Sequence, residues 1–437
     1  MKKISPFFAT LLFVLQLLFC NNIQAQENWV SYSQKVATKG YEGHRFRLQA
    51  LVKTETGDDS PSARLWARVD KQKGFSFFDN MWNLPIRSRE WKSYSIEGKI
   101  DSGSTQIAFG ALCQYNGKFY YDDVKLDIET EKGKWVNVFT ANFENDKNVL
   151  DQGIKRWRSG FNDNYKAQIV SGQKAQGTKC LLIEGTNVPS YGINNKVGKY
   201  AEVNGIRLYY EIYGQGEPLL VLHEFGSSIS TAGLFYPELI KKYKVIAIDN
   251  RGQGRSSDND LELTYEQMAS DINALLVQLK IDSAFVWGQS EGAIIGLILA
   301  MTHPEKVKRL LALGVLAQPD SAAIFPWALK SIEKQYKEST DPKVKRQTKL
   351  GLDYPRIPFS NLSQVKMSVL IMAGDRDYVR LEHTLKIFQN IPKSQLCIIP
   401  GTTHNAAWEK KEFFLMILND FFHKPFEMPD TKAWYEE

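Results

Sequence analysis

Ser290 lies in the segment Gly288-Gln289-Ser290-Glu291-Gly292, which fits a G-x-S-x-G pattern. A serine hydroxyl becomes a nucleophile toward a carbonyl carbon when a histidine accepts its proton and a carboxylate orients that histidine. Candidates for both partners follow along the chain, namely Asp377 and His404. The order serine, acid, histidine is the one found with serines of this pattern. We therefore predict that Ser290 is the nucleophile, with His404 as the candidate general base and Asp377 as the candidate orienting acid.

The residues around Ser290 predict a strand, a tight turn and a helix, because an apolar run precedes the turn and a longer apolar stretch, residues 292–303, follows it. A nucleophile on a strained turn needs glycines beside it to relieve crowding between strand and helix. A second helical pattern covers residues 265–280. The alternation of such helices with apolar runs predicts a mostly parallel sheet covered by helices. The candidate strands are residues 219–223, 245–249, 284–288, 310–314, 369–374 and 396–400.

Residues 197–425 resemble the α/β-hydrolase superfamily in five segments that occur in the family's order. They are the opening hairpin at 204–210, the oxyanion loop at 223–226, the loop at 249–256, the acid loop at 374–377 and the histidine loop at 401–404. The resemblance implies a catalytic domain at residues 200–425 and an oxyanion hole formed by the backbone N–H groups of Phe225 and Glu291. It implies no cofactor.

Two residues compete with the predicted acid and base. Asp375 also lies in the acid loop, but the G-x-x-D spacing of the family favours Asp377. His303 precedes a proline and has the surroundings of a residue at a helix end, whereas His404 follows a strand and turn near the end of the chain. The segment Gly252-Gln253-Gly254 does not indicate a dinucleotide site, because a third glycine and a suitably placed acidic residue are missing.

A segment at about 318–365 separates two candidate strands, and in this superfamily such an insertion forms a small helical lid. From 321 to 365 it carries eight basic and four acidic residues. A cationic lid would favour anionic substrates, although a solvated helix face explains the lysines equally well. Phe325 and Trp327 are candidate substrate contacts in this lid.

Glu224 departs from the H-G-x-G form that is usual in the oxyanion loop. A glutamate there adds bulk, and its negative charge would oppose a developing oxyanion. We expect Glu224 either to bind a polar or cationic part of the substrate or to pair with Arg251 or another basic residue.

The N-terminal part has a different pattern. From Tyr41 to Glu129, apolar and polar residues alternate with period two between turn residues, which predicts an antiparallel β-sandwich. Residues 107–110 and 121–126 resemble the last strands of galactose-binding-like, carbohydrate-module-like jelly rolls. Residues 137–185 look like the opening half of such a module, and we expect them to join the preceding sheets or to form a partial second module. A glycan is therefore a candidate partner, with Trp66, Trp82 and Trp91 as candidates for stacking on sugar rings, although packing in the core is the other role that these residues can have.

The whole chain divides into a signal peptide at 1–25, a sandwich at 26–185, a linker at 186–199, the catalytic domain at 200–425 and a tail at 426–437. Lys2 and Lys3, an apolar run and the small residue Ala25 are typical of a secretory signal, which predicts export to the periplasm or the exterior. An uncleaved anchor is disfavoured because the run is shorter than a spanning helix needs. A lipid anchor at Cys20 is disfavoured by the bulky Phe19 before it.

Composition excludes several classes of protein. Hydrophobic residues make up 43% and charged residues 24% of the 437 residues, which is typical of globular domains. No later segment could span a bilayer, no metal-ligand spacing occurs, and the net charge of +6 forms no basic stripe for nucleic acid. Cys113 and Cys180 could form a disulfide or remain as buried thiols, whereas Cys397 lies in the other half of the chain.

These observations predict an exported serine hydrolase that cleaves a small-molecule carboxylic ester or related acyl bond through an acyl-enzyme. The same fold also serves carbon–carbon bond hydrolases, lactonases and aminopeptidases. The alternative from another class is a non-catalytic carbohydrate-binding protein with a hydrolase-like body.

Overall fold

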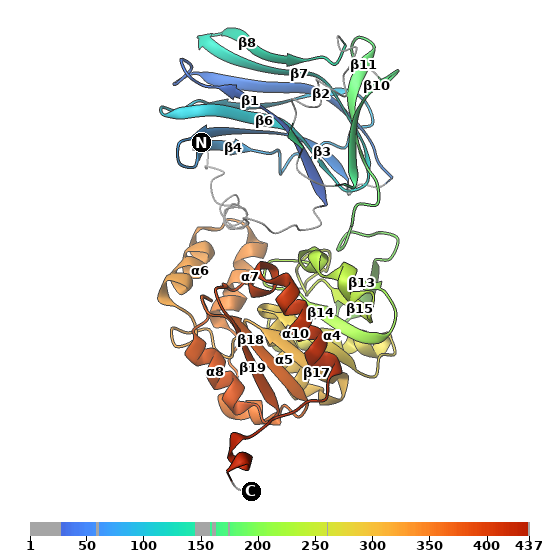
Figure 1. Ribbon diagram of the computed structural model, residues 1–437, viewed down its shortest axis with the longest axis vertical. Helices are drawn as coiled ribbons and strands as arrows, with labels where there is room; N and C mark the ends of the chain where they lie inside the picture. The colour runs from blue at the N-terminus through green and yellow to red at the C-terminus, as the bar shows by residue number, and fades with distance from the viewer. Residues whose placement is uncertain are drawn as a thin grey trace. The chain divides into compact units, whose positions relative to one another are not determined.

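The computed structural model describes residues 28–57, 61–144, 158–159, 163–173, 175–259 and 261–435, so the predicted signal peptide lies outside the described residues. Two compact units form, one covering Gln26–Ser190 and the other Tyr191–Glu437 (Figure 1). None of the described helices is long and apolar enough to cross a membrane.

The N-terminal unit consists of two antiparallel sheets, as predicted. The first sheet has the order β4 (Phe75–Asp79), β3 (Ser62–Lys71), β6 (Ser104–Gln114), β1 (Trp29–Ala37) and β9 (Arg158–Ser159). The second has the order β10 (Tyr165–Ser171), β11 (Lys179–Gly185), β7 (Gly117–Glu131), β2 (Arg45–Glu55) and β5 (Lys92–Lys99), and β8 (Lys134–Ala141) also pairs with β7.

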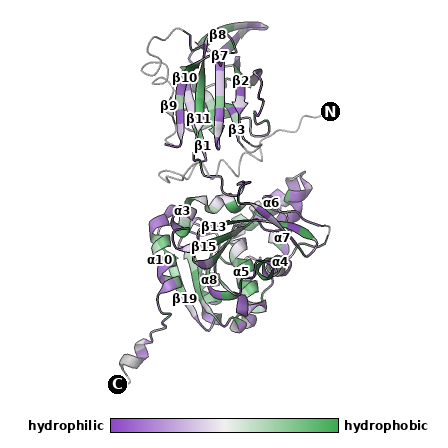
Figure 2. Cartoon of the chain, turned by 90° about the vertical axis from the view of Figure 1, so that its right-hand side faces the viewer, coloured by the Kyte–Doolittle hydropathy of each residue, from purple (hydrophilic) through white to green (hydrophobic). Residues whose placement is uncertain are grey.

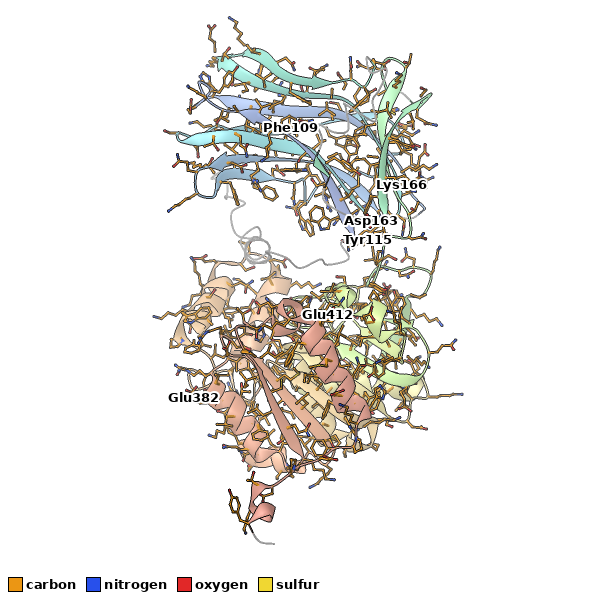
Figure 3. The ribbon with its side chains drawn as sticks, in the orientation of Figure 1. Phe109, Tyr115, Asp163, Lys166, Glu382 and Glu412 are labelled. Carbon is orange, nitrogen blue, oxygen red and sulfur yellow. The ribbon has the colours of Figure 1, made fainter. Side chains whose placement is uncertain are left out.

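The alternating residues of these strands supply one core. Phe46 and Leu48 of β2 and Leu65 of β3 are buried together with residues of β6, such as Phe109 (Figure 3). Because successive side chains of a strand point to opposite faces, the polar residues between them lie on the outer faces. The period-two pattern therefore marks the two inner faces of a sandwich.

The described strands of residues 137–185 join the preceding sheets, which confirms the first of the two expectations for this segment. The long strand β7 pairs with β11 along Gly117–Tyr121 and with β8 from Val124 onward, on the same edge. Between the two stretches Asp123 has a φ of +47°, a conformation that interrupts a regular strand. The first part of β7 thus pairs with β11, and its second part pairs with β8.

The two cysteines of the sandwich are free thiols in separate places. Cys113 is buried in the core between the sheets, whereas Cys180 belongs to a small cluster with Tyr120 and Leu182. The structure therefore agrees with the second expectation for this pair, in which both cysteines remain as buried thiols.

The candidate stacking tryptophans do not share one platform. Trp66 lies on β3 of the first sheet, whereas Trp91 precedes β5 of the second sheet and packs edge-on against Tyr120. Trp82 is 52% exposed, and the Arg64 guanidinium lies 5.0 Å from its ring centroid. Glycan binding stays a prediction, and it can involve only a subset of these rings at once.

The C-terminal unit contains one eight-stranded sheet. Its order is β12 (Lys199–Val203), β13 (Ile206–Tyr213), β15 (Tyr243–Ile248), β14 (Glu217–Leu222), β16 (Ala284–Gln289), β17 (Val307–Leu313), β18 (Ser368–Gly374) and β19 (Ser394–Ile399). The pairs β12–β13 and β13–β15 are antiparallel and the others are parallel. The carboxyl ends of β14 to β19 therefore meet at one edge of the sheet, where ligands bind in open α/β sheets.

Helices cover both faces of this sheet. On one face, α4 (Tyr265–Gln278), α5 (Glu291–Thr302) and α8 (Leu381–Asn390) share a core with Leu220 of β14. On the other, α3 (Tyr236–Leu239), α9 (Ala406–Glu409) and α10 (Lys411–His423) pack with Leu219 and Val221. Adjacent residues of β14 thus enter opposite cores, which explains why the strand is apolar throughout.

The predicted linker is divided between the two units. Val188 exchanges two hydrogen bonds with the side chain of Asn116, so residues up to about 190 pack on the sandwich. Residues from Tyr191 pack instead on the C-terminal unit, where Lys199 already begins strand β12.

The side chain of Glu211 binds the second half of the linker to the C-terminal unit. Its carboxylate is fully buried and accepts four hydrogen bonds. The N–H groups of Gly192 and Asn194 donate at 2.6 and 2.8 Å, and the hydroxyls of Tyr209 and Tyr213 donate at 2.6 and 2.7 Å. Since a buried carboxylate needs such donors to replace water, residues 192–194 are part of the folded C-terminal unit.

We expect a fragment of residues 191–437 to be more stable than one of residues 197–437. The shorter fragment lacks two of the four donors to Glu211, a loss of about 3 kcal/mol in the free energy of unfolding. Urea denaturation of both fragments measures the difference, with a fragment of residues 186–437 as the control that should match the longer one. Equal midpoints for 191–437 and 197–437 would show that water replaces the lost donors.

Candidate active site

Ser290 forms a strained turn between β16 and α5. Its backbone has φ 52° and ψ −112°, in the region that non-glycine residues rarely adopt, and its N–H donates to the Leu313 carbonyl at 2.8 Å. A Cβ atom at Gly288 would lie 2.3 Å from the Gly292 carbonyl oxygen, and one at Gly292 would lie 2.1 Å from the Leu222 carbonyl oxygen. The glycines of the pattern are therefore required by close backbone contacts, and the serine is presented at the carboxyl edge of the sheet.

His404 and Asp377 are joined by a hydrogen bond of 2.8 Å between Nδ1 and Oδ1. The same carboxylate oxygen accepts from the Val379 N–H at 3.0 Å. Burial alone would lower the pKa of His404, but the charge of Asp377 and the hydrogen bond to it, together with the charge of Glu224, raise that pKa above its usual value. Because Nδ1 donates to Asp377, the lone pair of the imidazole is on Nε2, which is buried and has no hydrogen-bond partner in the described structure.

Asp375 does not contact His404. Its carboxylate accepts from the N–H groups of Gly401 at 2.7 Å and Thr402 at 3.2 Å, so it holds the loop that carries the histidine. His303 is the residue that ends α5, and its ring lies 3.7 Å from Glu305. Of the competing residues, Asp377 and His404 are the pair that the fold brings together.

The oxyanion loop is held by a neutral histidine. The Asn250 N–H donates to Nε2 of His223 at 3.0 Å, so the proton is on Nδ1, which donates to the Glu224 carbonyl oxygen at 2.7 Å. Burial lowers the pKa of His223 to about 4, so this state persists at neutral pH. No acceptor among the described residues takes the N–H of Phe225. The N–H of Glu291, the first residue of α5, has no acceptor within its helix.

Comparison with known proteins identifies this arrangement. Residues 217–338 match the family model described as the alpha/beta hydrolase fold. The match covers β14, the oxyanion loop, β15, β16 with its serine turn, and the first lid helix. The C-terminal unit has the α/β-hydrolase fold.

The relatives of this chain align with different shares of it and of their own length. RutD of Azorhizobium caulinodans, which is named for carbamate hydrolysis, is 34% identical over 28% of this chain and 46% of its own length. The 2-hydroxy-6-oxo-6-phenylhexa-2,4-dienoate hydrolase of Burkholderia cepacia is 24% identical over 55% of this chain and 98% of its own. The solved structure of the enol-lactonase from Burkholderia xenovorans LB400 aligns with 52% of this chain and all of its own, at 19% identity and a TM-score of 0.45.

The side chain of Glu291 points into the α/β-hydrolase core, away from solvent, and is only 1% exposed. Its Oε1 accepts from Nδ2 of Asn250 at 3.0 Å and from Nε2 of Gln253. Burial raises the pKa of this carboxyl to about 7. Glu291 therefore ties the residue after the nucleophile to the loop after β15, a link that the sequence did not reveal.

Glu224 does not pair with Arg251, so that part of our expectation is wrong. Arg251 is fully buried and makes a bidentate ion pair with Asp271, with both N···O distances at 2.7 Å. The Glu224 carboxyl group is partly buried, and burial raises its pKa while the charge of His404 opposes that rise. Its electrostatic partner is therefore the histidine of the active site.

Tyr378 is a site residue that sequence reasoning missed. Its ring centroid lies 4.3 Å from that of His404 with an interplanar angle of 39°, and its hydroxyl interacts with the Ser290 side chain. Burial raises the pKa of this phenol, so it remains protonated at neutral pH. Its place directly after the predicted acid was the one available signal, because a residue adjacent to Asp377 must lie near the histidine.

The lid contains α6 (Pro326–Glu338), α7 (Pro342–Asp353) and a 3-10 turn, η3 (Phe359–Gln364), and its two α-helices are mainly hydrophilic (Figure 2). Arg346 of α7 pairs with Asp258 at 2.7 Å, which fixes this helix to the loop after β15. The Phe325 N–H donates to the Tyr378 carbonyl at 3.0 Å, but its ring lies under Arg380, and Trp327 is 65% exposed. No described ring contact joins either aromatic side chain to the triad residues.

We expect Tyr378→Ala to lower kcat by about 10- to 100-fold, because the imidazole loses the ring that packs against it and its orientation becomes less defined. Tyr378→Phe keeps the ring and should stay within about threefold of the wild type. Steady-state kinetics on one soluble ester compares the two variants. Equal losses in both would assign the effect to the hydroxyl group instead of the ring.

Proposed function

We propose that the C-terminal unit is a serine hydrolase that cleaves a carboxylic ester or related acyl bond of a small molecule through an acyl-enzyme. The observation that supports this most directly is the His404–Asp377 hydrogen bond next to a serine held in a strained strand-to-helix turn. Neither a buried histidine–carboxylate pair nor a strained serine is needed for a binding protein, so this geometry favours the enzyme over the non-catalytic alternative.

In the proposed reaction, Oγ of Ser290 attacks the carbonyl carbon and its proton passes to Nε2 of His404. Asp377 stabilises the imidazolium that forms, and the N–H groups of Phe225 and Glu291 donate to the oxyanion. His404 then protonates the leaving group, which departs and leaves Ser290 acylated. Water attacks the acyl-enzyme in the same manner, His404 accepts its proton, and the acid is released with Ser290 restored.

The relatives do not decide which acyl bond is cleaved. One is named for a carbamate and another for a dienoate whose hydrolysis breaks a carbon–carbon bond. We propose an ester because a serine turn with two backbone donors is sufficient for ester hydrolysis, whereas carbon–carbon cleavage needs in addition a site that protonates carbon.

A fluorophosphonate probe tests the proposed function directly. It should label Ser290 in the wild-type protein, and Ser290→Ala should abolish the labelling while leaving the circular dichroism spectrum unchanged. A folded wild-type protein that resists the probe and hydrolyses none of a panel of short-chain and sugar-linked esters would favour the non-catalytic alternative.

We also propose that the protein is exported. This rests on the order of charged, apolar and small residues at 1–25. Fractionation of an expressing bacterium, followed by N-terminal sequencing, would show the mature chain beginning near Gln26 outside the cytoplasm. An intact N-terminus in the cytoplasmic fraction would contradict this proposal.

A further inference from the structure

The carboxyl group of Glu224 has no lysine or arginine partner among the described residues. Within the described residues, no ion pair or hydrogen bond involves its carboxyl oxygens. Arg251, the basic residue that the sequence suggested as its partner, is occupied by Asp271. The groups that interact electrostatically with Glu224 are His404 and Tyr378.

The two carboxylates beside His404 are therefore not equivalent. Asp377 is compensated by hydrogen bonds from His404 and from the Val379 N–H. Glu224 has no such donors among the described residues, although it is partly buried. A carboxylate in such a place is costly unless a cation or hydrogen-bond donors approach it. A group of a ligand that enters the site from solution can supply such a partner.

The backbone fixes where that group would lie. Glu224 directly precedes Phe225, whose N–H is the proposed oxyanion donor, and the carbonyl of Glu224 is held by Nδ1 of His223 at 2.7 Å. The side chain thus starts from a rigid point next to the scissile carbonyl. A ligand group bound by Glu224 would be separated from that carbonyl by only a few bonds.

We propose that Glu224 binds a protonated amine on the acyl part of the substrate, so that preferred substrates carry an ammonium group a few bonds from the scissile carbonyl. The inference rests on the proposed function and names its substrate class. The ammonium group would also neutralise Glu224 and remove its repulsion of the oxyanion. A substrate with a neutral acyl group leaves that repulsion in place. The preference for an ammonium substrate should therefore appear in kcat as well as in KM.

A matched pair of esters tests the inference. Methyl β-alaninate and methyl butanoate have the same length and differ in an ammonium group in place of a methyl group. At about pH 8, where both Glu224 and the ester amine carry charge to a useful extent, the wild type should prefer the ammonium ester by about 100-fold in kcat/KM. Glu224→Gln should remove the preference, because it lowers kcat/KM for the ammonium ester and, by removing the repulsion of the oxyanion, raises kcat for methyl butanoate.

Glu238→Gln is the matched control variant, because Glu238 is a surface carboxylate paired with Lys241 at 2.8 Å and lies outside the site. It should keep the full preference. A second readout is the acid limb of kcat/KM for methyl butanoate. Removing the Glu224 charge should lower the pKa of His404, with Asp377 still in place and Tyr378 still neutral, and so move the limb to lower pH.

The inference is overturned if the wild type cleaves both esters equally well, if Glu224→Gln affects both equally, or if the acid limb does not move. The fluorophosphonate probe can label Ser290 although neither ester is turned over. In that case the inference is tested by whether an amine ligand protects Ser290 from labelling. Propylammonium should slow labelling of the wild type and not of Glu224→Gln, and an absence of protection overturns the inference. Failure of the proposed function is distinct, because Ser290 would then not be labelled at all.

Discussion

Ser290→Ala and His404→Ala should each lower kcat by about 10⁴- to 10⁶-fold on any ester that the wild type cleaves. The two residues act as a unit, so the double variant should be no worse than either single one. Asp377→Asn should cost about 10⁴-fold, because an amide in place of the carboxylate favours the wrong tautomer of the imidazole. Active-site titration of the wild type and kinetics on the variants measure these losses.

Asp375→Asn is the matched control for Asp377→Asn, because both are aspartates of one loop and Asp375 hydrogen-bonds only to backbone N–H groups of the histidine loop among its described contacts. We expect a loss of less than about tenfold there. If Asp375→Asn is the more damaging change, with both variants folded, the assignment of the acid is wrong.

Asp271→Asn should lower the stability of the C-terminal unit by about 3–5 kcal/mol, the largest structural effect that we expect of a single substitution. The side chains of Arg251 and Asp271 are 0% and 1% exposed, so the change leaves a buried guanidinium without its counter-ion. In a unit of this size the loss corresponds to about 10 °C in Tm. Calorimetry of the full chain, which separates the transitions of the two units, provides the measurement.

Asp258→Asn serves as the comparison, because Asp258 also binds an arginine Nε at 2.7 Å but its side chain and that of Arg346 are 25% and 31% exposed. Exposure to water makes such a pair worth about 1 kcal/mol or less. The double variant Arg251→Met/Asp271→Leu should recover much of the stability lost by Asp271→Asn. A small effect of Asp271→Asn, similar to that of Asp258→Asn, would mean that water reaches Arg251.

Local patterns were sufficient where the chemistry depends on neighbours in the chain. The glycines around Ser290 are required by backbone contacts within the turn and with β14, so the five-residue pattern marked the strained serine turn. Strand alternation predicted the sandwich because burial on one face repeats every second residue. The order of the acid and histidine loops followed from the order of the parallel strands.

Contacts between distant segments were not accessible in this way. The partner of Arg251 lies 20 residues further on, at the helical position of Asp271, and a pattern of charges cannot show which carboxylate faces the guanidinium. Glu211 accepts from a segment that composition marked as linker, since Gly and Asn at 192 and 194 donate through their backbone. The choice of sheet for β9, β10 and β11 likewise depends on which edges are open in the folded sandwich.

The sequence by itself therefore determined the fold class of both units and the identity of the candidate triad, because periodicity and the sterics of a tight turn are local properties. The tertiary structure alone decided which polar groups meet. It placed Glu224 within electrostatic reach of His404, packed the ring of Tyr378 against that of His404 and buried Glu291 against the loop after β15. The reason is physical: burial sets the cost of each charge, and the direction of each side chain is set by packing between elements far apart in the chain.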